Sequence, residues 1–378
     1  MDLGVYVGSG SNLHLLNPLD GAIVSVASPC QSRGLACVAG DWVIATQRKE
    51  AAMHLFRRGQ KSPHLKCRLA EPMGPVVVSP EGAYCFAGGS SGKLYVWDLW
   101  SGQLLRSWHG HHKPIRALGM TDDSSYLVTG GDDAVISVWN ILDVVNVDDN
   151  SAEYVIRDFH SWSDHSQAIT ALHVGQGGVR GRVFSASLDR TARVFEIFSR
   201  QLLCTISCDV FLTAVIATPD ESWLLAGAGD GTIIAADLRA AACRSSGVSA
   251  GGVMMEGAQS QERLEGHIHP VCSLLSVDQG TLLLSASEDG TVKTWDFASR
   301  QCIQTTDLKA PITCMVAAGL IDPKESLRTQ PTDTDLALLA PLRKFGSAGK
   351  PDAAHCLLPL KRSLVDNQTE KPSKQGRC

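Results

Sequence analysis

The clearest pattern of hydrophobic and polar positions lies in residues 282–305, LLLSASEDGTVKTWDFASRQCIQT. The pattern predicts a strand, a tight turn, a second strand, another turn and a third strand. Residues 287–291 form the tight turn, and residues 292–297 alternate as a half-buried strand does. A hydrophobic period of two of this kind indicates a β-sheet and not a helix.

The same pattern recurs along the chain. Close copies occupy residues 127–141 (LVTGGDDAVISVWNI) and 84–99 (YCFAGGSSGKLYVWDL). Looser copies follow the same frame in residues 5–16, 43–56, 183–197 and 224–238. The residue six places after the turn position in each copy gives the series Leu16, Phe56, Trp97, Trp139, Phe195, Ala236 and Trp295.

The spacings in this series are 40, 41, 42, 56, 41 and 59 residues. Four of the six match the ~40–45-residue period of a WD-repeat blade. The two long spacings indicate insertions, at residues 143–164 and at residues 240–261, and the second is rich in Gly, Ala and Ser, as mobile loops are. Seven anchors predict an all-β fold, a seven-bladed WD-repeat β-propeller.

The two ends of the repeat region fit together. The chain starts inside a blade, and one further strand pattern, ITCMVAA at residues 312–318, follows the seventh copy. We expect that strand to be the inner strand of the first blade, which closes the ring and removes an open sheet edge. Residues 1–318 would then be one propeller, residues 319–378 a C-terminal tail, and truncation before Ile312 badly destabilising.

Two copies contain the full set of hydrogen-bonding residues of a WD repeat, with Gly-His placed 28 residues before Trp. In that family the His bridges an Asp and a Ser or Thr, and the Trp closes the network; the resemblance implies the same here. A buried His or Asp needs such partners. The fifth copy has Phe195 in place of Trp. The expected members are His111, Thr129, Asp133 and Trp139 in the fourth copy, His165, Ser185 and Asp189 in the fifth, and His267, Ser285, Asp289 and Trp295 in the seventh.

Composition and charge narrow the classes of function that the chain could have. Hydrophobic residues make up 44% and charged residues 19%, which allows a sizeable core. From Gly319 onward there are 10 Lys/Arg and 7 Asp/Glu, a net charge of +3, whereas residues 1–318 carry 24 and 32, a net charge of −8. A basic footprint for nucleic acid is therefore absent from the repeat region, and direct sequence-specific RNA or DNA binding is not supported.

Cysteine use and the first residues indicate an intracellular protein. Several of the 12 cysteines lie inside apolar runs, where a free thiol behaves as a small hydrophobe. The start, MDLGVYVGSG, lacks a charged segment followed by a long apolar one, so we expect no signal peptide. No apolar run reaches the ~18 residues of a membrane span. These features predict a soluble chain with reduced thiols and no membrane contact.

No residue set predicts a metal or cofactor site. His109 and His112 flank His111, but His111 already has a structural role, which leaves too few ligands. Cys204 and Cys208 flank an expected outer strand, and the chain has no CxxC pair. The glycines at positions 227, 229 and 231 precede a strand, whereas a phosphate loop precedes a helix, so we expect a β-turn there.

Catalysis is not expected either. The His, Asp and Ser residues of the complete copies could suggest a hydrolytic triad. They recur once per blade, as a structural network does and a single active site does not. The sequence therefore predicts no catalytic residue, no cofactor, no small-molecule substrate and no enzyme.

The tail contains two apolar islands in polar surroundings, DLALLAPLRKF at residues 335–345 and CLLPL at residues 356–360. They could dock on the propeller or on a partner, or the tail could be partly disordered; the sequence leaves both open. The basic residues 361–362 and 371–377 are too sparse to predict a nuclear signal.

The stretch 162–238 resembles the WD-repeat-containing protein 18 family, the propeller subunit of a complex that matures the large ribosomal subunit, and the resemblance extends over most of residues 35–318. It departs at the C-terminus, because the family typically ends in a charged helical segment and this chain ends in LVDNQTEKPSKQGRC. The matching residues are Trp162, Ser163, His165, Ile169, Thr170, Leu172, His173, Gly177, Gly178, Ser187, Leu188, Asp189, Thr191, Glu196, Asp209, Val210, Asp237 and Leu238, then Asp123, Ser124, Ser125, Gly130 and Gly131, then Leu308, Lys309, Pro311, Ile312 and Thr313.

The resemblance implies a non-catalytic scaffold of the nucleus, found in nucleolus and nucleoplasm. Its partners would be a helical-repeat scaffold subunit and a large assembly ATPase, with the pre-ribosomal particle bound indirectly. Removal of the internal spacer from pre-rRNA would depend on it, while other proteins would do the cutting. We expect the insertions at 143–164 and 240–261 to face partners, because loops on a rigid scaffold often carry function.

Fold alone does not give function, so other classes stay open. One is the substrate receptor of a ubiquitin ligase, which would favour a ring of arginines around the axis; Arg116, Arg182 and Arg193 are scattered in the sequence. A chromatin or signalling scaffold is another, separated from ribosome assembly only by its partners. A propeller enzyme would need unpaired catalytic groups or a metal set.

Overall fold

The structure is a computed structural model, which describes residues 2–27, 32–38, 42–47, 50–146, 156–239, 253–255 and 261–321. The chain divides into two compact units, Met1–Gly346 and Ser347–Cys378. All of the described residues belong to the first unit. Residues 322–378, and with them both apolar islands of the tail, lie outside the described part.

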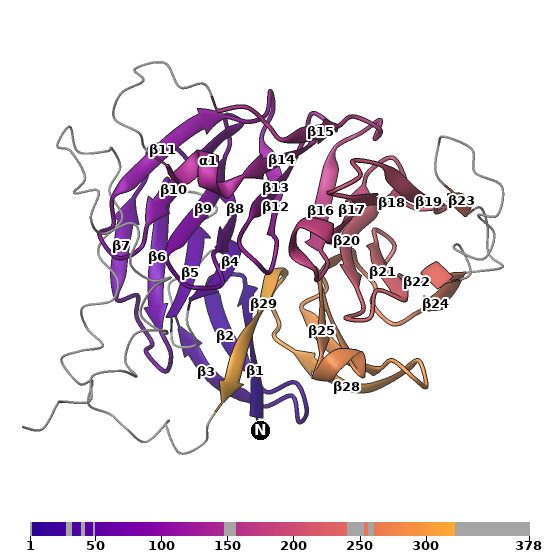
Figure 1. The fold of residues 1–378 in the computed structure, drawn as a ribbon. Helices are drawn as coiled ribbons and strands as arrows, with labels where there is room; N and C mark the ends of the chain where they lie inside the picture. The colour runs from indigo at the N-terminus through magenta and orange to yellow at the C-terminus, as the bar shows by residue number, and fades with distance from the viewer. Residues whose placement is uncertain are drawn as a thin grey trace, which may run out of the picture. The chain divides into compact units, whose positions relative to one another are not determined.

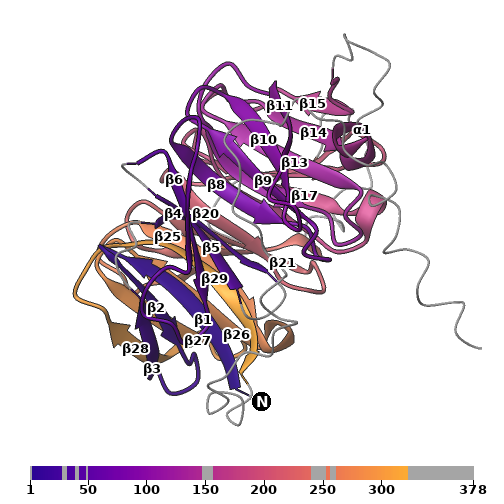
Figure 2. The same ribbon diagram turned by 90° about the vertical axis from the view of Figure 1, so that its left-hand side faces the viewer.

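Seven sheets form the blades of a β-propeller (Figures 1 and 2). Blade 1 consists of β29 (Ile312–Ile321), β1 (Asp2–Ser9), β2 (Asn12–Leu16) and β3 (Ile23–Ala27). Blade 2 consists of β4 (Ser32–Val38), β5 (Trp42–Gln47), β6 (Ala52–Arg57) and β7 (Leu65–Arg68). Blade 3 consists of β8 (Met73–Val78), β9 (Tyr84–Gly89), β10 (Lys93–Asp98) and β11 (Leu104–His109).

The remaining blades follow in chain order. Blade 4 consists of β12 (Ile115–Met120), β13 (Tyr126–Gly131), β14 (Ile136–Asn140) and β15 (His160–Trp162). Blade 5 consists of β16 (Ile169–Val174), β17 (Arg182–Ser187), β18 (Thr191–Glu196), β19 (Leu202–Ser207) and β23 (Val253–Met255). Blade 6 consists of β20 (Leu212–Ala217), β21 (Trp223–Ala228), β22 (Ile233–Asp237) and β24 (Gln261–Leu264). Blade 7 consists of β25 (Val271–Val277), β26 (Leu282–Ser287), β27 (Thr291–Asp296) and β28 (Gln301–Asp307).

Short helices lie between some strands: α1 (Ile141–Val145), η1 (Gly178–Arg180) and η2 (Asp278–Gly280). None of the helices in the described ranges is long and apolar enough to cross a membrane.

The ring closes by pairing the two ends of the repeat region. β29 pairs antiparallel with β1, from Asp2 opposite Ile321 to Ser9 opposite Ile312. Each inner strand contacts the inner strands of the two neighbouring blades, and β29 takes its place between β25 and β4. The prediction that residues 312–318 supply the inner strand of blade 1 is confirmed, and the strand continues to Ile321.

The seven anchor residues all lie on the third strand of their blades and are buried. Each anchor belongs to a hydrophobic cluster that it shares with the preceding blade. Trp139 of blade 4, for example, packs edge-on against Trp108 of blade 3, with ring centroids 5.7 Å apart. The cores therefore lie between blades, and each blade depends on both of its neighbours.

Hydrogen bonds from bulged residues connect several inner strands. Near the start of β16, β20 and β25 a β-bulge leaves one residue out of register: Thr170, Thr213 and Cys272. A bulge turns the side chain of such a residue in a new direction. The Thr170 hydroxyl donates to the Leu212 carbonyl (2.8 Å) and the Thr213 hydroxyl to the Val271 carbonyl (2.7 Å). The Cys272 thiol donates to the Ile312 carbonyl (3.1 Å), which continues the series into blade 1.

The insertion in blade 6 reaches the neighbouring blade. β23 lies between β22 and β24 in the sequence, but it pairs in parallel with β19, the outer strand of blade 5. Residues 240–252 and 256–260 on either side of it lie outside the described part, as do residues 147–155 of the other insertion.

Replacing Ile312 tests how much the closing strand β29 contributes to stability, because this side chain is only 1% exposed. We expect Ile312→Ala to lower the free energy of unfolding by about 2–5 kcal/mol, because it leaves a cavity. The matched control is Ile303→Ala in the outer strand β28, where the side chain is 58% exposed; its cost should stay within about 0.5 kcal/mol. Urea unfolding measures both, and equal costs would contradict the closure.

Candidate functional site

The fourth blade brings its four predicted residues together. His111 lies in the loop between β11 and β12, Thr129 on β13, Asp133 in the turn between β13 and β14, and Trp139 on β14. The His111 ring lies 3.0 Å from Asp133 through Nδ1 and 2.7 Å from the Thr129 hydroxyl through Nε2. The indole N–H of Trp139 donates to the same hydroxyl at 3.1 Å. A Cβ added at Gly110 would lie 3.2 Å from the Trp139 ring, so glycine fits this close approach.

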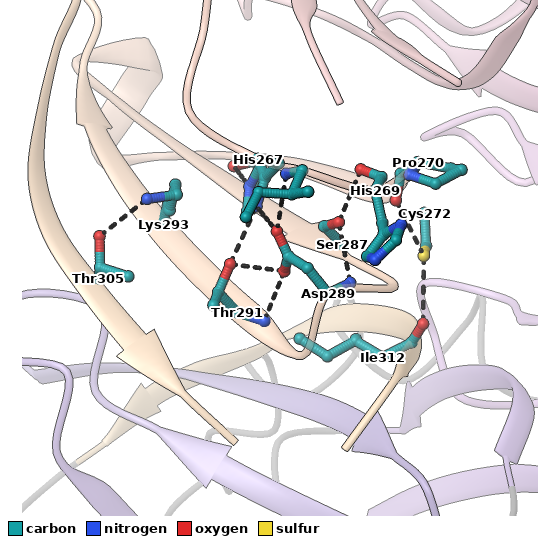
Figure 3. Close-up of polar contacts among 12 residues, drawn as sticks. His267, His269, Pro270, Cys272, Ser287, Asp289, Thr291, Lys293, Thr305 and Ile312 are labelled. Carbon is teal, nitrogen blue, oxygen red and sulfur yellow. Dashed lines mark hydrogen bonds and ion pairs between the residues drawn. The ribbon is translucent and has the colours of Figure 1, made fainter. Parts of the chain in front are cut away.

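The seventh blade repeats the arrangement. His267 Nδ1 lies 3.0 Å from Asp289, and Nε2 lies 2.7 Å from the Ser285 hydroxyl, which also accepts the Trp295 N–H at 2.9 Å. Figure 3 shows His267, Asp289 and Thr291 pointing toward one another across the turn before β27. The backbone N–H groups of Ile268 and Thr291 also donate to the Asp289 carboxylate, so loop and turn are held together.

The fifth blade keeps the first part of the network. His165 lies 2.9 Å from Asp189 and 2.7 Å from the Ser185 hydroxyl. Phe195 has no N–H to offer that hydroxyl, and its ring stacks instead on Trp162 of blade 4 at 4.7 Å. An aromatic contact thus stands where the other two blades have a hydrogen bond.

Hydrogen bonds keep the aspartates of these networks charged. Burial alone would raise the pKa of Asp289, but hydrogen bonds from Thr291, Ile268 and His267 lower it to about 2. Similar hydrogen bonds hold the pKa of Asp133 and Asp189 below the ordinary value against the same effect of burial. Burial lowers the pKa of His267, while Asp289 opposes that shift.

In blade 7, both ring nitrogens of His267, the Ser285 hydroxyl and the Trp295 indole N–H take part in one chain of hydrogen bonds. At neutral pH the aspartate is charged and the His267 ring is neutral, so Nδ1–H donates to Asp289 and Nε2 accepts from the Ser285 hydroxyl, which accepts from Trp295. The His111 and His267 side chains are 0% exposed and that of His165 is 1% exposed. No substrate can touch these rings in the folded protein.

A fourth network, in blade 3, was missed in the sequence. Glu71, in the loop before β8, accepts hydrogen bonds from the Ser91 hydroxyl (2.7 Å), the Ser91 N–H (2.9 Å), Ser90 (3.1 Å) and the Tyr95 hydroxyl (2.8 Å). Burial would raise the pKa of Glu71, and these hydrogen bonds lower it. Burial and then Glu71 raise the pKa of Tyr95. The sequence signal that could have indicated this network is an acidic residue directly before Pro72, followed about 20 residues later by the turn Ser90-Ser91-Gly92.

Of the residues considered for metal binding, His111 belongs to a polar network, and Cys204 and Cys208 are buried. His109 and His112 are exposed, whereas His111 belongs to the network of blade 4. Within the ranges that the structure describes, no group of three or more His, Cys, Asp or Glu side chains could hold a metal ion. Burial raises the pKa of the Cys204 and Cys208 thiols to about 11, which disfavours the thiolate that a metal needs.

The glycine-rich segment 227–231 runs from the end of β21 into the turn before β22, so a strand follows it as predicted. A Cβ at Gly229 would collide with the ring of Phe211, which lies over this turn in blade 6.

The three arginines weighed for a ligand-reading ring do not form one. Arg116 bonds Asp132 at 2.7 Å, Arg182 pairs with Glu221 at 3.3 Å, and Arg193 lies 3.8 Å from Asp164. Only Arg116 lies on an inner strand; the other two lie on the second and third strands of blade 5.

The ring of seven sheets and the His–Asp–Ser/Thr networks of blades 4, 5 and 7 define a WD-repeat β-propeller. The family described as "WD domain, G-beta repeat" matches residues 102–140 and 258–296, which include the third strands of blades 4 and 7, where the networks are complete.

Relatives at about one-third identity specify the family further. WD repeat-containing protein 18 of Bos taurus is 33% identical over 291 residues, which cover 76% of this chain and 65% of the relative. The protein of that name from Danio rerio is 33% identical over 285 residues (75% and 64%). Pre-rRNA-processing protein IPI3 of Yarrowia lipolytica is 30% identical over 262 residues (68% and 60%). The chain is a homologue of the WD repeat-containing protein 18 family, as its sequence predicted, and spans just under two thirds of the length of these relatives.

Removing one buried imidazole should weaken the fold. We expect His111→Ala to lower the free energy of unfolding by about 1–3 kcal/mol, because Asp133 and Thr129 lose a buried partner. His112→Ala, one residue later and exposed, is the control and should cost no more than about 0.5 kcal/mol. Urea unfolding compares them; a costly His112→Ala with a neutral His111→Ala would refute the role of the network.

Acid should weaken the same contacts. The pKa of Asp289 is about 2 in the folded protein against an ordinary 3.8, so its contribution to stability is full above pH 3.8 and is lost as pH falls toward 2. We expect the wild-type unfolding free energy to fall more steeply over this range than that of Asp289→Asn. The control is Asp230→Asn at the matching turn position of blade 6, where the aspartate is exposed and bonds Thr232. Parallel curves for wild type and Asp289→Asn would contradict the assignment.

Proposed function

We propose that this chain is a non-catalytic protein-interaction scaffold in the biogenesis of the large ribosomal subunit, and that it supports removal of the internal spacer from pre-rRNA. The observation that carries the proposal is the similarity over about three quarters of the chain to relatives named WD repeat-containing protein 18, together with the similarity to a protein named for pre-rRNA processing. Those names belong to the relatives, and the function of this chain is inferred from them.

The positions of the polar networks favour a scaffold. The histidines and aspartates of the three His–Asp–Ser/Thr networks are paired with one another and turned away from solvent. What the ring offers to solvent is the turns and the outer edges of its blades. A rigid ring with varied turns is suited to binding proteins.

One set of turns offers an apolar surface. Trp100, Leu142 and Phe198 each lie two residues beyond the third strand of blades 3, 4 and 5, and they are 56%, 72% and 66% exposed. An Asx turn holds Trp100, whose N–H donates to Asp98. Leu142 lies in the first turn of α1, and its N–H donates to the N-cap residue Asn140. Equivalent positions in successive blades lie along one rim of the ring. Large exposed apolar side chains grouped in this way are typical of protein interfaces.

The partners we propose are a helical-repeat scaffold subunit and a large assembly ATPase, in the nucleolus and nucleoplasm. The net charge of −8 on residues 1–318 disfavours direct contact with RNA, so the pre-ribosomal particle would be bound through proteins. The insertions at 143–164 and 240–261 are proposed to face partners as well.

Purification of the tagged protein from growing cells at low salt tests the proposal. We expect large-subunit ribosomal proteins and assembly factors to co-purify. Replacing Trp100, Leu142 and Phe198 together by Ser should reduce their recovery about tenfold or more, because apolar anchors dominate such interfaces. Ile303→Ser, an exposed apolar position in blade 7, is the control and should leave recovery unchanged.

Recovery of a cullin-type ligase, or of no ribosomal precursor, would overturn the proposed function. Full recovery with the triple variant would keep the function and remove the rim as the contact surface. Deletion of either insertion with every partner retained would remove that insertion from the interface.

A further inference from the structure

The outer strands of the blades differ in how they protect their free edges. An outer strand presents unpaired N–H and C=O groups, and proteins commonly protect such an edge with charged residues or by keeping it short. The strands β7, β11, β24 and β28 each contain at least one charged residue, and β15 is only three residues long. Two outer strands have neither device: β19, with sequence LLCTIS, and β3, with sequence IVSVA.

The first of these two edges is covered by the chain itself. β23 pairs in parallel with β19, placing Val253, Met254 and Met255 opposite Cys204, Thr205 and Ile206. A short apolar segment from an insertion thus completes a fifth strand in blade 5. The molecule therefore contains one example of how it protects an uncharged outer strand.

The second edge is open within the described part of the chain. β3 ends its sheet and pairs there only with β2. Ile23, Val24 and Val26 are 47%, 52% and 37% exposed, and Leu19 in the preceding turn is 58% exposed. These four belong to one hairpin, and they are a third of the twelve large hydrophobic residues that are exposed among the described residues. Such an edge is an aggregation hazard unless something covers it.

The course of the chain points to the segment that covers it. The described chain ends at Ile321, which pairs with Asp2 in the same blade. The strand order β29–β1–β2–β3 puts β3 three strand spacings, roughly 14 Å, from β29. The first apolar run after Ile321 is LALLA at residues 336–340, and the 14 residues between can span up to roughly 45 Å.

The sequence of that run suits an added strand. It has five residues, as β3 has, and Pro341 follows it, a residue that cannot continue a ladder of hydrogen bonds. The residues from Gly319 onward carry a net charge of +3 and residues 1–318 a net charge of −8, so the two parts attract.

We propose that residues 336–340 add a fifth strand to β3 of blade 1, the counterpart of β23 on β19 in blade 5. The tail then covers the one uncharged edge of more than three residues that stays open among the described strands. This inference rests on the propeller alone and is independent of the role in ribosome assembly.

Hydrogen exchange of the full chain, read by mass spectrometry, tests the proposal. In the wild type we expect the amides of Ile23–Ala27 to exchange slowly. Leu338→Asp should speed their exchange about tenfold or more, because a charge in the added strand opens the edge. Leu357→Asp in the second apolar island is the matched control and should leave the rate unchanged. The peptide covering Tyr126–Gly131 of β13 reports whether the propeller itself stays folded.

A reciprocal variant tests the other partner of the pairing. Val24→Asp should speed tryptic cleavage after Arg343 and Lys344 and leave cleavage after Lys361 and Arg362 unchanged, and Val24→Thr should change neither. Fast exchange of β3 in the wild type, or the same rate with Leu338→Asp, would overturn the proposal. Protection that appears only as protein concentration rises would also overturn it, because a second copy would then cover the edge.

Discussion

The pairing of β29 with β1 is the contact on which the rest of the propeller depends. Every hydrophobic cluster lies between two blades, so no blade completes its own core. An open ring would leave blades 7 and 1 each with an exposed face, and Val5, Val7, Ile312 and Met315 would lose their surroundings together. The bonds from Thr170, Thr213 and Cys272 run toward the same seam. Closure thus couples residues that are more than 300 positions apart, and folding of the ring should be cooperative for that reason.

Polar networks add specificity to this apolar ring in four of the seven blades. Blades 4 and 7 have the complete His–Asp–Ser/Thr–Trp chain of hydrogen bonds. Blade 5 has the same chain without the Trp, and Phe195 stacks in its place. In blade 3 the loop and the turn are joined through Glu71. In each case a loop before an inner strand is tied to the turn after the second strand. A buried imidazole or carboxylate tolerates no missing partner, so these blades hold one arrangement of loop and turn. The other blades rely on packing, as at Gly229, where the Phe211 ring fills the place above the turn.

The sequence predicted what depends on local periodicity. All seven anchors, from Leu16 to Trp295, lie where the repeat places them, and the closing strand begins at Ile312. The members of the predicted networks lie within hydrogen-bonding distance of one another. Glu71 was missed because blade 3 has its acidic residue in the loop before the first strand, whereas the other networks have it in the turn after the second strand. Blade 3 therefore lacks both the His and the Asp by which the repeat is recognised. The pairing of β23 with β19 was missed because a parallel contact between an insertion and a neighbouring blade has no local signature.

The functional account treats the chain as a rigid ring whose surface turns and edges bind proteins, and rigidity requires that the closing strands do not open on their own. Native-state hydrogen exchange of the β1 amides, from Asp2 to Ser9, compared with those of β13, tests this claim most directly. The account predicts that both groups exchange only through global unfolding, with the same free energy and the same dependence on denaturant. Exchange of β1 at a clearly lower free energy than β13 would mean that the ring opens at its seam while the other blades stay folded, and would contradict the account.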